Sequence, residues 1–148
     1  TGLSFLNILW DDVLSANRDP QELALFLQEN VEKDIVIETW ERELGVLTEH
    51  RYHFPDQSLL ARTHAANYRG GPRDYALGAD YFQKHQPSYL IIGSYAKLSH
   101  LYDVKFLAEH SDLIATIGNG EKRYEVYKLE LSSMSTHSET DKNNQEPD

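Results

Sequence analysis

Three glutamates and a tryptophan follow an apolar run in the segment IETWEREL, residues 37–44. Glu38, Glu41 and Glu43 supply carboxylates, which accept hydrogen bonds from hydroxyl groups. Trp40 supplies a broad apolar ring face, which is suited to stacking on a sugar ring. These residue types together predict a carbohydrate site.

A second segment, GSYAK at residues 93–97, follows another apolar run and adds Tyr95 and Lys97. If the two apolar runs are neighbouring parallel strands, their carboxyl ends lie at one edge of the sheet, where open α/β sheets bind ligands. Tyr95 then joins Trp40 as a second stacking ring, and Lys97 offers a contact for a hydroxyl or an anion. The expected site is therefore a single acidic and aromatic rim.

Two other interpretations of the glutamates stay open. Glu41 and Glu43 can begin a helix, where acidic side chains favour the positive end of the dipole, with Trp40 in the core. That interpretation leads to a purely structural module that binds nothing. Alternatively, Glu38 and Glu43 form the carboxylate pair of a small stand-alone carbohydrate-acting hydrolase, in which the two groups must lie about 5 to 10 Å apart.

A metal site is a further candidate, because His50 and His53 lie three residues apart and close to Glu43 and Glu49. Histidine and glutamate are ligands of zinc and iron. On a strand, however, residues three apart point to opposite faces. The segment also lacks the helical His-Glu-x-x-His spacing of metalloproteases. We therefore predict no metal ligand and no other cofactor, and we assign no catalytic residue.

The rim requires strands to position it, and two aliphatic runs predict such strands. Residues 34–37 and 88–94 are apolar on both faces, which is typical of strands in a covered parallel sheet. The runs 112–117 and 123–131 flank the turn sequence Gly118-Asn119-Gly120 and predict an antiparallel hairpin. The remaining expected elements are a short strand at 51–54 and helices at 3–16, 20–31, 58–68 and 75–85.

The fold class that follows is α/β. We expect a single three-layer domain with helices on both faces of a mixed sheet. The sheet has parallel central strands and the antiparallel hairpin at its C-terminal end.

Composition excludes several classes of protein. The chain has 148 residues, enough for one core, and its net charge of −10 opposes binding to nucleic-acid phosphates. It contains no cysteine, so disulfides and thiolate chemistry are excluded. No apolar stretch reaches the roughly 18 residues that span a bilayer. The chain begins at Thr1 without an initiator methionine, which predicts a processed protein or a piece of a longer one.

Three segments carry a family resemblance: DIVIETWERELGVLTEHRYHFP, PSYLIIGSYAKLSHLYD and LIATIGNGEKRYEVYKL. Together they resemble the soluble carboxyl-terminal part of certain bacterial multi-spanning glycosyltransferases, which are similar to the dolichyl-phosphate-mannose-protein mannosyltransferases. The resemblance covers about residues 15–130 and includes no diagnostic catalytic motif.

The resemblance implies a non-catalytic extracytoplasmic domain, on the periplasmic side, of a membrane glycosyltransferase that uses a polyprenyl-phosphate sugar donor. Its implied partners are the transmembrane part of the same protein and a saccharide or lipid-linked sugar. Residues 1–16 become a membrane-proximal amphipathic helix, 17–131 the soluble α/β domain, and 132–148 a disordered polar tail. The matching motif also contains His53, which completes the candidate ligand-binding set: Glu38, Trp40, Glu41, Glu43, His53, Tyr95 and Lys97.

Overall fold

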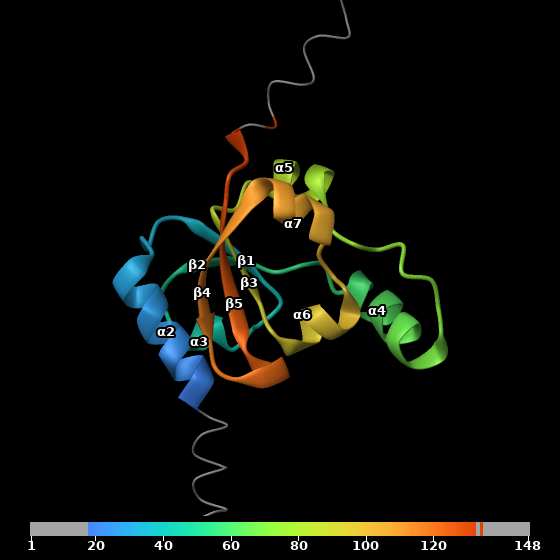
Figure 1. Ribbon diagram of the computed structural model, residues 1–148, viewed down its shortest axis with the longest axis horizontal. Helices are drawn as coiled ribbons and strands as arrows, with labels where there is room; N and C mark the ends of the chain where they lie inside the picture. The colour runs from blue at the N-terminus through green and yellow to red at the C-terminus, as the bar shows by residue number, and fades with distance from the viewer. Residues whose placement is uncertain (1–17, 133, 135–148) are drawn as a thin grey trace, which may run out of the picture.

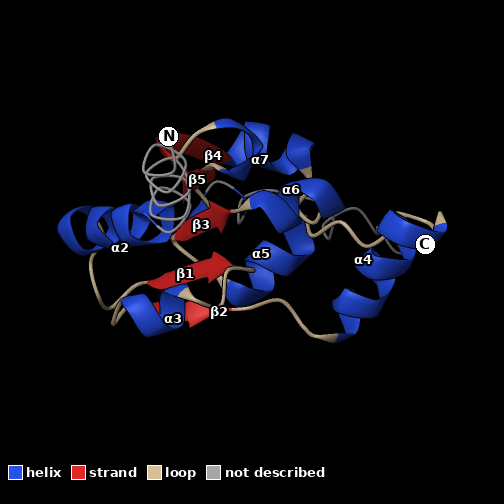
Figure 2. Ribbon diagram, turned by 90° about the horizontal axis from the view of Figure 1, so that it is seen from below, coloured by secondary structure: helices blue, strands red, loops and turns tan. Residues whose placement is uncertain are grey.

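A five-stranded mixed sheet forms the centre of the protein, and helices lie against both of its faces (Figures 1 and 2). The computed structural model describes residues 18–132 and residue 134. The helix predicted for residues 3–16 lies outside this part of the chain, as do residues 133 and 135–148 of the predicted tail. The strand order is β2-β1-β3-β5-β4, and the predicted α/β class is confirmed.

The bounds of the elements, in chain order, are α2 (Arg18–Asn30), β1 (Val36–Thr39), α3 (Leu44–Leu47), β2 (Arg51–His53), α4 (Ser58–Arg69), α5 (Ala79–His85), β3 (Tyr89–Ile92), α6 (Ser94–Ser99), α7 (Val104–His110), β4 (Ser111–Ile117), the 3-10 helix η1 (Gly120–Lys122) and β5 (Tyr124–Leu129).

The two aliphatic runs form adjacent parallel strands, as predicted. β1 pairs in parallel with β2 on one side and with β3 on the other. The chain passes from β1 through α3 to β2, and then through α4 and α5 to β3 on the far side of β1. The chain therefore reaches the two neighbours of β1 in opposite directions across the sheet. In open α/β sheets with such a reversal, ligands bind in a crevice at the carboxyl ends of the two strands, which here are β1 and β3.

The predicted C-terminal hairpin is also confirmed. β5 pairs antiparallel with both β3 and β4, and a register irregularity lies between Leu113 and Ala115. Gly118 and Gly120 adopt φ values of 90° and 64° in the connection, a left-handed conformation that glycine accepts at low cost.

Each face of the sheet has its own apolar core, because successive strand residues point to opposite sides. Ile37 and Ile91 pack with the helix residues Leu23 and Leu27 on the face covered by α2 and α3. On the other face, one cluster joins Leu90 and Ile92 to residues of the remaining helices: Leu59, Ala66, Phe82, Ala96, Phe106 and Leu107. Figure 2 shows α5, α6 and α7 against this second face, with α4 beyond α6.

The helices differ from the sequence prediction in two places. The helix expected over residues 75–85 begins only at Ala79, because Leu77 exchanges backbone hydrogen bonds of 2.8 and 2.9 Å with Leu101 and Asp103. The short helices α6 and α7 were not predicted. The side chain of Asp103 caps α7 by accepting from the amides of Lys105 and Phe106. Among the described residues, none of the helices has the length and apolar character needed to cross a bilayer.

Candidate functional site

The carboxyl ends of β1 and β3 bring together five of the seven candidate residues. Thr39 lies opposite Ile91 in the parallel register, so residues 40–43 leave the sheet beside residues 93–97. We call these two segments the carboxyl rim. It contains Trp40, Glu41, Glu43, Tyr95 and Lys97.

The two aromatic rings of the rim meet each other. Trp40 and Tyr95 stack with ring centroids 5.5 Å apart and an interplanar angle of 20°. Trp40 is half-buried against the core cluster of the second face. The Tyr95 hydroxyl lies 2.9 Å from the Thr63 hydroxyl of α4. The pair therefore ties β1 to α6 and α4, and only the ring surface that remains exposed is free to contact a ligand.

Glu41 is the most perturbed carboxyl of the rim. Its Oε1 atom is buried and has no hydrogen-bond partner within the described structure. Burial, and then repulsion from Glu43, raises the pKa of Glu41 to about 7, while Lys97 opposes the shift. The carboxyl is therefore partly protonated near neutral pH.

Gly93 makes room for this carboxyl. A Cβ atom built on Gly93 would lie 1.8 Å from Glu41 Oε1 and 2.3 Å from its Cδ. Any side chain at position 93 would thus displace the Glu41 carboxyl from its buried position. The glycine at the end of β3 is explained by this close approach.

One interpretation of the acidic segment was that Glu41 and Glu43 begin a helix. The position of Glu43 agrees with it, because Glu43 immediately precedes α3. Its carboxylate also accepts a long hydrogen bond of 3.4 Å from the Tyr124 hydroxyl of β5. The same interpretation placed Trp40 in the core, and Trp40 packs against the core while part of its ring stays exposed.

Lys97 is engaged by partners that sequence reasoning missed. Its ammonium donates to the Arg123 carbonyl at 2.7 Å and pairs with Glu125 at 3.2 Å. Glu125 also accepts from Arg123 at 3.2 Å and from the Tyr127 hydroxyl at 2.9 Å. These contacts lower the pKa of Glu125 although burial alone would raise it. In the sequence, these partners are marked only by the alternation of charged and aromatic residues in RYEVY, residues 123–127.

Glu38 lies in the interior, and His53 lies beside it at a partly exposed position. The two residues are opposite each other in the β1 and β2 register, and His53 Nδ1 lies 2.5 Å from Glu38 Oε2. The hydroxyls of Tyr81 and Tyr102 donate to Glu38 Oε1 at 2.7 and 3.2 Å. Glu38 has no exposed surface. We call Glu38, His53, Tyr81 and Tyr102 the buried polar cluster.

Desolvation raises the pKa of Glu38, and the hydrogen bonds from Tyr81 and His53 partly offset that effect. The ring of His53 stacks against His85 at 4.1 Å, and its side chain keeps 31% of its exposure. The expected strand ended at residue 37 with Glu38 on the rim, whereas the structure places Glu38 inside β1, between β2 and β3. Its tyrosine partners lie 43 and 64 residues away and gave no sequence signal.

The structure does not bring Glu38 and Glu43 together. Glu38 contacts Tyr81 and Tyr102, which belong to the core of the second face. Glu43 contacts Tyr124, which packs against the core beneath α2. The two carboxylates thus point to opposite faces of the sheet, which is not the arrangement of a pair flanking one glycosidic bond.

His50 and His53 separate in the same way. His50 is buried with Nε2 3.0 Å from the Val31 carbonyl, whereas His53 belongs to the buried polar cluster. No group of three potential metal ligands occurs within residues 18–132 and 134.

Comparisons with known proteins give no relative for this chain: no family model, no curated protein and no solved structure matches it.

Proposed function

We propose that this chain is the non-catalytic extracytoplasmic domain of a membrane glycosyltransferase that uses a polyprenyl-phosphate sugar donor. The carboxyl rim would hold the sugar of the donor or acceptor next to the membrane part of the same protein. The proposal combines the family resemblance of the sequence with the geometry of the rim.

The observation that carries the proposal is the convergence of three kinds of group at one strand edge. Trp40 and Tyr95 offer partly exposed rings, Glu41 offers a carboxyl oxygen without a partner, and Lys97 offers an ammonium. Sugar recognition uses these groups: ring faces for the apolar side of the sugar, and charged acceptors and donors for hydroxyls or a phosphate. Because Glu41 Oε1 is covered, its carboxyl would turn toward the rim when it accepts a ligand hydroxyl.

The test is a titration of the 148-residue chain, followed by two-dimensional amide NMR, with mannose 1-phosphate, methyl α-mannoside and inorganic phosphate as separate probes. Mannose 1-phosphate is expected to shift the Trp40 indole resonance and the amides of residues 93–97. Glu41→Gln should weaken this binding roughly tenfold, because a hydrogen bond to a charged group contributes about 1.5 to 3 kcal/mol.

Glu49→Gln is the matched control. Glu49 is an exposed glutamate paired with Lys33, remote from the rim, so its replacement should leave the titration unchanged. If none of the three probes moves a resonance of the rim, the sugar-binding role is wrong.

A purely structural module is the second candidate, and a specific observation favours it. Six of the seven candidate residues already contact other side chains of this chain: Glu38, Trp40, Glu43, His53, Tyr95 and Lys97. In that case deletion of the domain would destabilise the parent protein, while saccharide titrations of the isolated chain would show no binding.

A further inference from the structure

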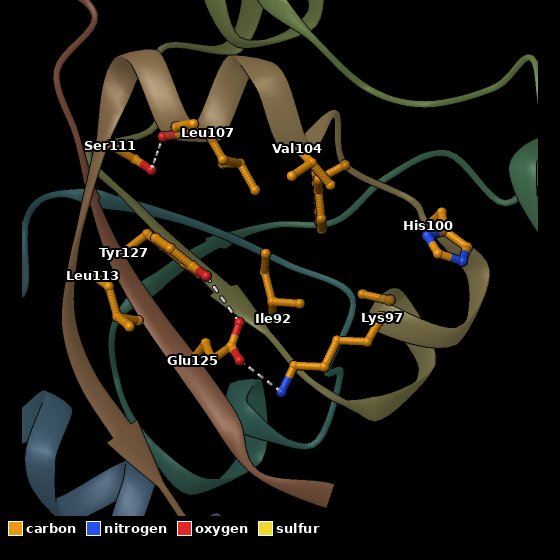
Figure 3. A pocket seen from close by; sticks show the side chains of 12 residues that line it. Ile92, Lys97, His100, Val104, Leu107, Ser111, Leu113, Glu125 and Tyr127 are labelled. Atoms are coloured by element: carbon orange, nitrogen blue, oxygen red, sulfur yellow. Dashed lines mark hydrogen bonds and ion pairs between the residues drawn. The ribbon is translucent and has the colours of Figure 1, made fainter. Parts of the chain in front are cut away.

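An apolar pocket lies between the helices α6 and α7 and the C-terminal hairpin (Figure 3). Its volume is about 470 Å³, within the range of small-molecule sites. The close-up shows side chains from three directions around one hollow, namely Ile92 of β3, Val104 and Leu107 of α7, and Leu113 and Tyr127 of the hairpin. The pocket is open to solvent at Val104, which is 72% exposed.

Lys97 and Glu125, which form an ion pair, lie together at one end of the pocket. Figure 3 shows Glu125 bonded both to the Tyr127 hydroxyl and to Lys97, while α7 contributes the apolar side chains of Val104 and Leu107. The pocket is therefore amphiphilic, with a long apolar wall and a charged end.

Lys97 also lines a second hollow, which lies beside the pocket. This basic hollow is formed by Ser94, Lys97, Leu98 and residues 120–123. Across the pocket and the basic hollow, three cations face two carboxylates; the charged residues are Lys97, Lys122, Arg123, Glu121 and Glu125. This local excess of positive charge contrasts with the net charge of −10 of the whole chain.

Donors remain free at the boundary between the two hollows. A lysine ammonium carries three N–H donors, and Lys97 uses two of them on the Arg123 carbonyl and Glu125. The Arg123 guanidinium donates to Glu125 through its Nε, which leaves the donors of its terminal amino groups for a ligand. An anion at this boundary would meet both side chains without first breaking the Lys97–Glu125 pair.

We infer that the apolar pocket and the basic hollow form one site for a single apolar chain that ends in a phosphate, such as an isoprenyl or alkyl phosphate. The chain would lie against Leu107, Leu113 and Ile92, and the phosphate would accept hydrogen bonds from Lys97 and Arg123. A neutral amphiphile would gain only the apolar contacts, and a cationic one would meet the positive excess. The inference deepens the proposed function, on which it rests for the identity of the lipid part.

The test uses probes that contain no sugar. The 148-residue chain is titrated with decyl phosphate, decanol and inorganic phosphate, below the micelle concentration, and methyl NMR reports the site. Decyl phosphate is expected to shift the methyl resonances of Ile92, Leu107 and Leu113. It should bind at least roughly tenfold more tightly than decanol, because its phosphate accepts charge-assisted hydrogen bonds that the decanol hydroxyl cannot match.

Lys97→Met should reduce this difference to about twofold while leaving decanol binding unchanged. Lys105→Met is its matched control, since Lys105 lies on α7 but outside the lining of the pocket and the basic hollow. Val104→Glu, at the exposed start of α7 where an acid suits the helix dipole, should weaken both decyl probes without unfolding the protein.

Equal binding of decyl phosphate and decanol, or shifts confined to residues outside the pocket, would overturn the inference. Shifts produced as strongly by inorganic phosphate would show an anion site without a chain site, which is also a refutation. Because the probes carry no sugar, this result is separate from the mannose 1-phosphate titration. Either site can be found in the absence of the other.

Discussion

Replacing Glu41 by glutamine should remove a pH dependence from the stability of the fold. The pKa of Glu41 rises from 4.5 to about 7 on folding, mainly because its carboxyl is desolvated. A carboxyl with a raised folded pKa binds protons more tightly in the folded than in the unfolded state. The free energy of unfolding therefore falls as pH increases from about 4.5 through about 7.

The size of the effect follows from the two pKa values. Each pKa unit corresponds to about 1.36 kcal/mol, so full ionisation of Glu41 destabilises the fold by about 3 kcal/mol at most. Coupling to Glu43 and screening at a half-buried edge bring the expected loss to about 2 kcal/mol. The glutamine side chain does not ionise, so this loss is absent from the Glu41→Gln protein.

The assay is urea unfolding at pH 5, 6, 7 and 8, followed by circular dichroism. The stability of Glu41→Gln relative to the natural sequence should increase by about 2 kcal/mol between pH 5 and 8. Glu38, whose pKa is also raised, titrates in both proteins and cancels in the comparison. Glu49→Gln, at an exposed position, should leave the slope unchanged. Stability curves for the natural and Glu41→Gln proteins that stay parallel across this range would refute the reasoning.

Two further substitutions probe the rim and the interior. Gly93→Ala should push the Glu41 carboxyl into solvent and return its pKa toward 4.5, which a carbon-detected NMR titration measures; a pKa still near 7 would contradict the close approach. Glu38→Ala should reduce the free energy of unfolding by about 3 to 5 kcal/mol, because buried partners lose their acceptor. Tyr81→Phe removes a single hydrogen bond and should lower it by only about 1 to 2 kcal/mol in the same urea assay, so equal losses would count against the buried polar cluster.

The sheet could be predicted largely because its signals are local. The runs around Ile37 and Ile91 are apolar on both faces, and such runs are typical of central parallel strands. Gly118 and Gly120 mark the hairpin turn through their backbone freedom alone. These features need no knowledge of distant residues.

The site was harder to predict, because its partners are distant in sequence. The parallel register placed Trp40 next to Tyr95, as expected. It also placed the Glu38 carboxylate where His53, Tyr81 and Tyr102 form hydrogen bonds with it. The apolar pocket depends on α6 and α7, which are six and seven residues long. Helices this short show less than two turns of periodicity, so hydrophobic spacing identifies them poorly.

The buried polar cluster also fixes the alignment of the strands. Glu38 lies opposite Leu90 on one side and His53 on the other. A slip of β1 by one residue would turn the carboxylate toward Leu23 and Leu27 of α2, away from the hydroxyls of Tyr81 and Tyr102. A misaligned pairing would thus separate the Glu38 carboxylate from the partners that stabilise it, which favours the observed registration of the central strands during folding.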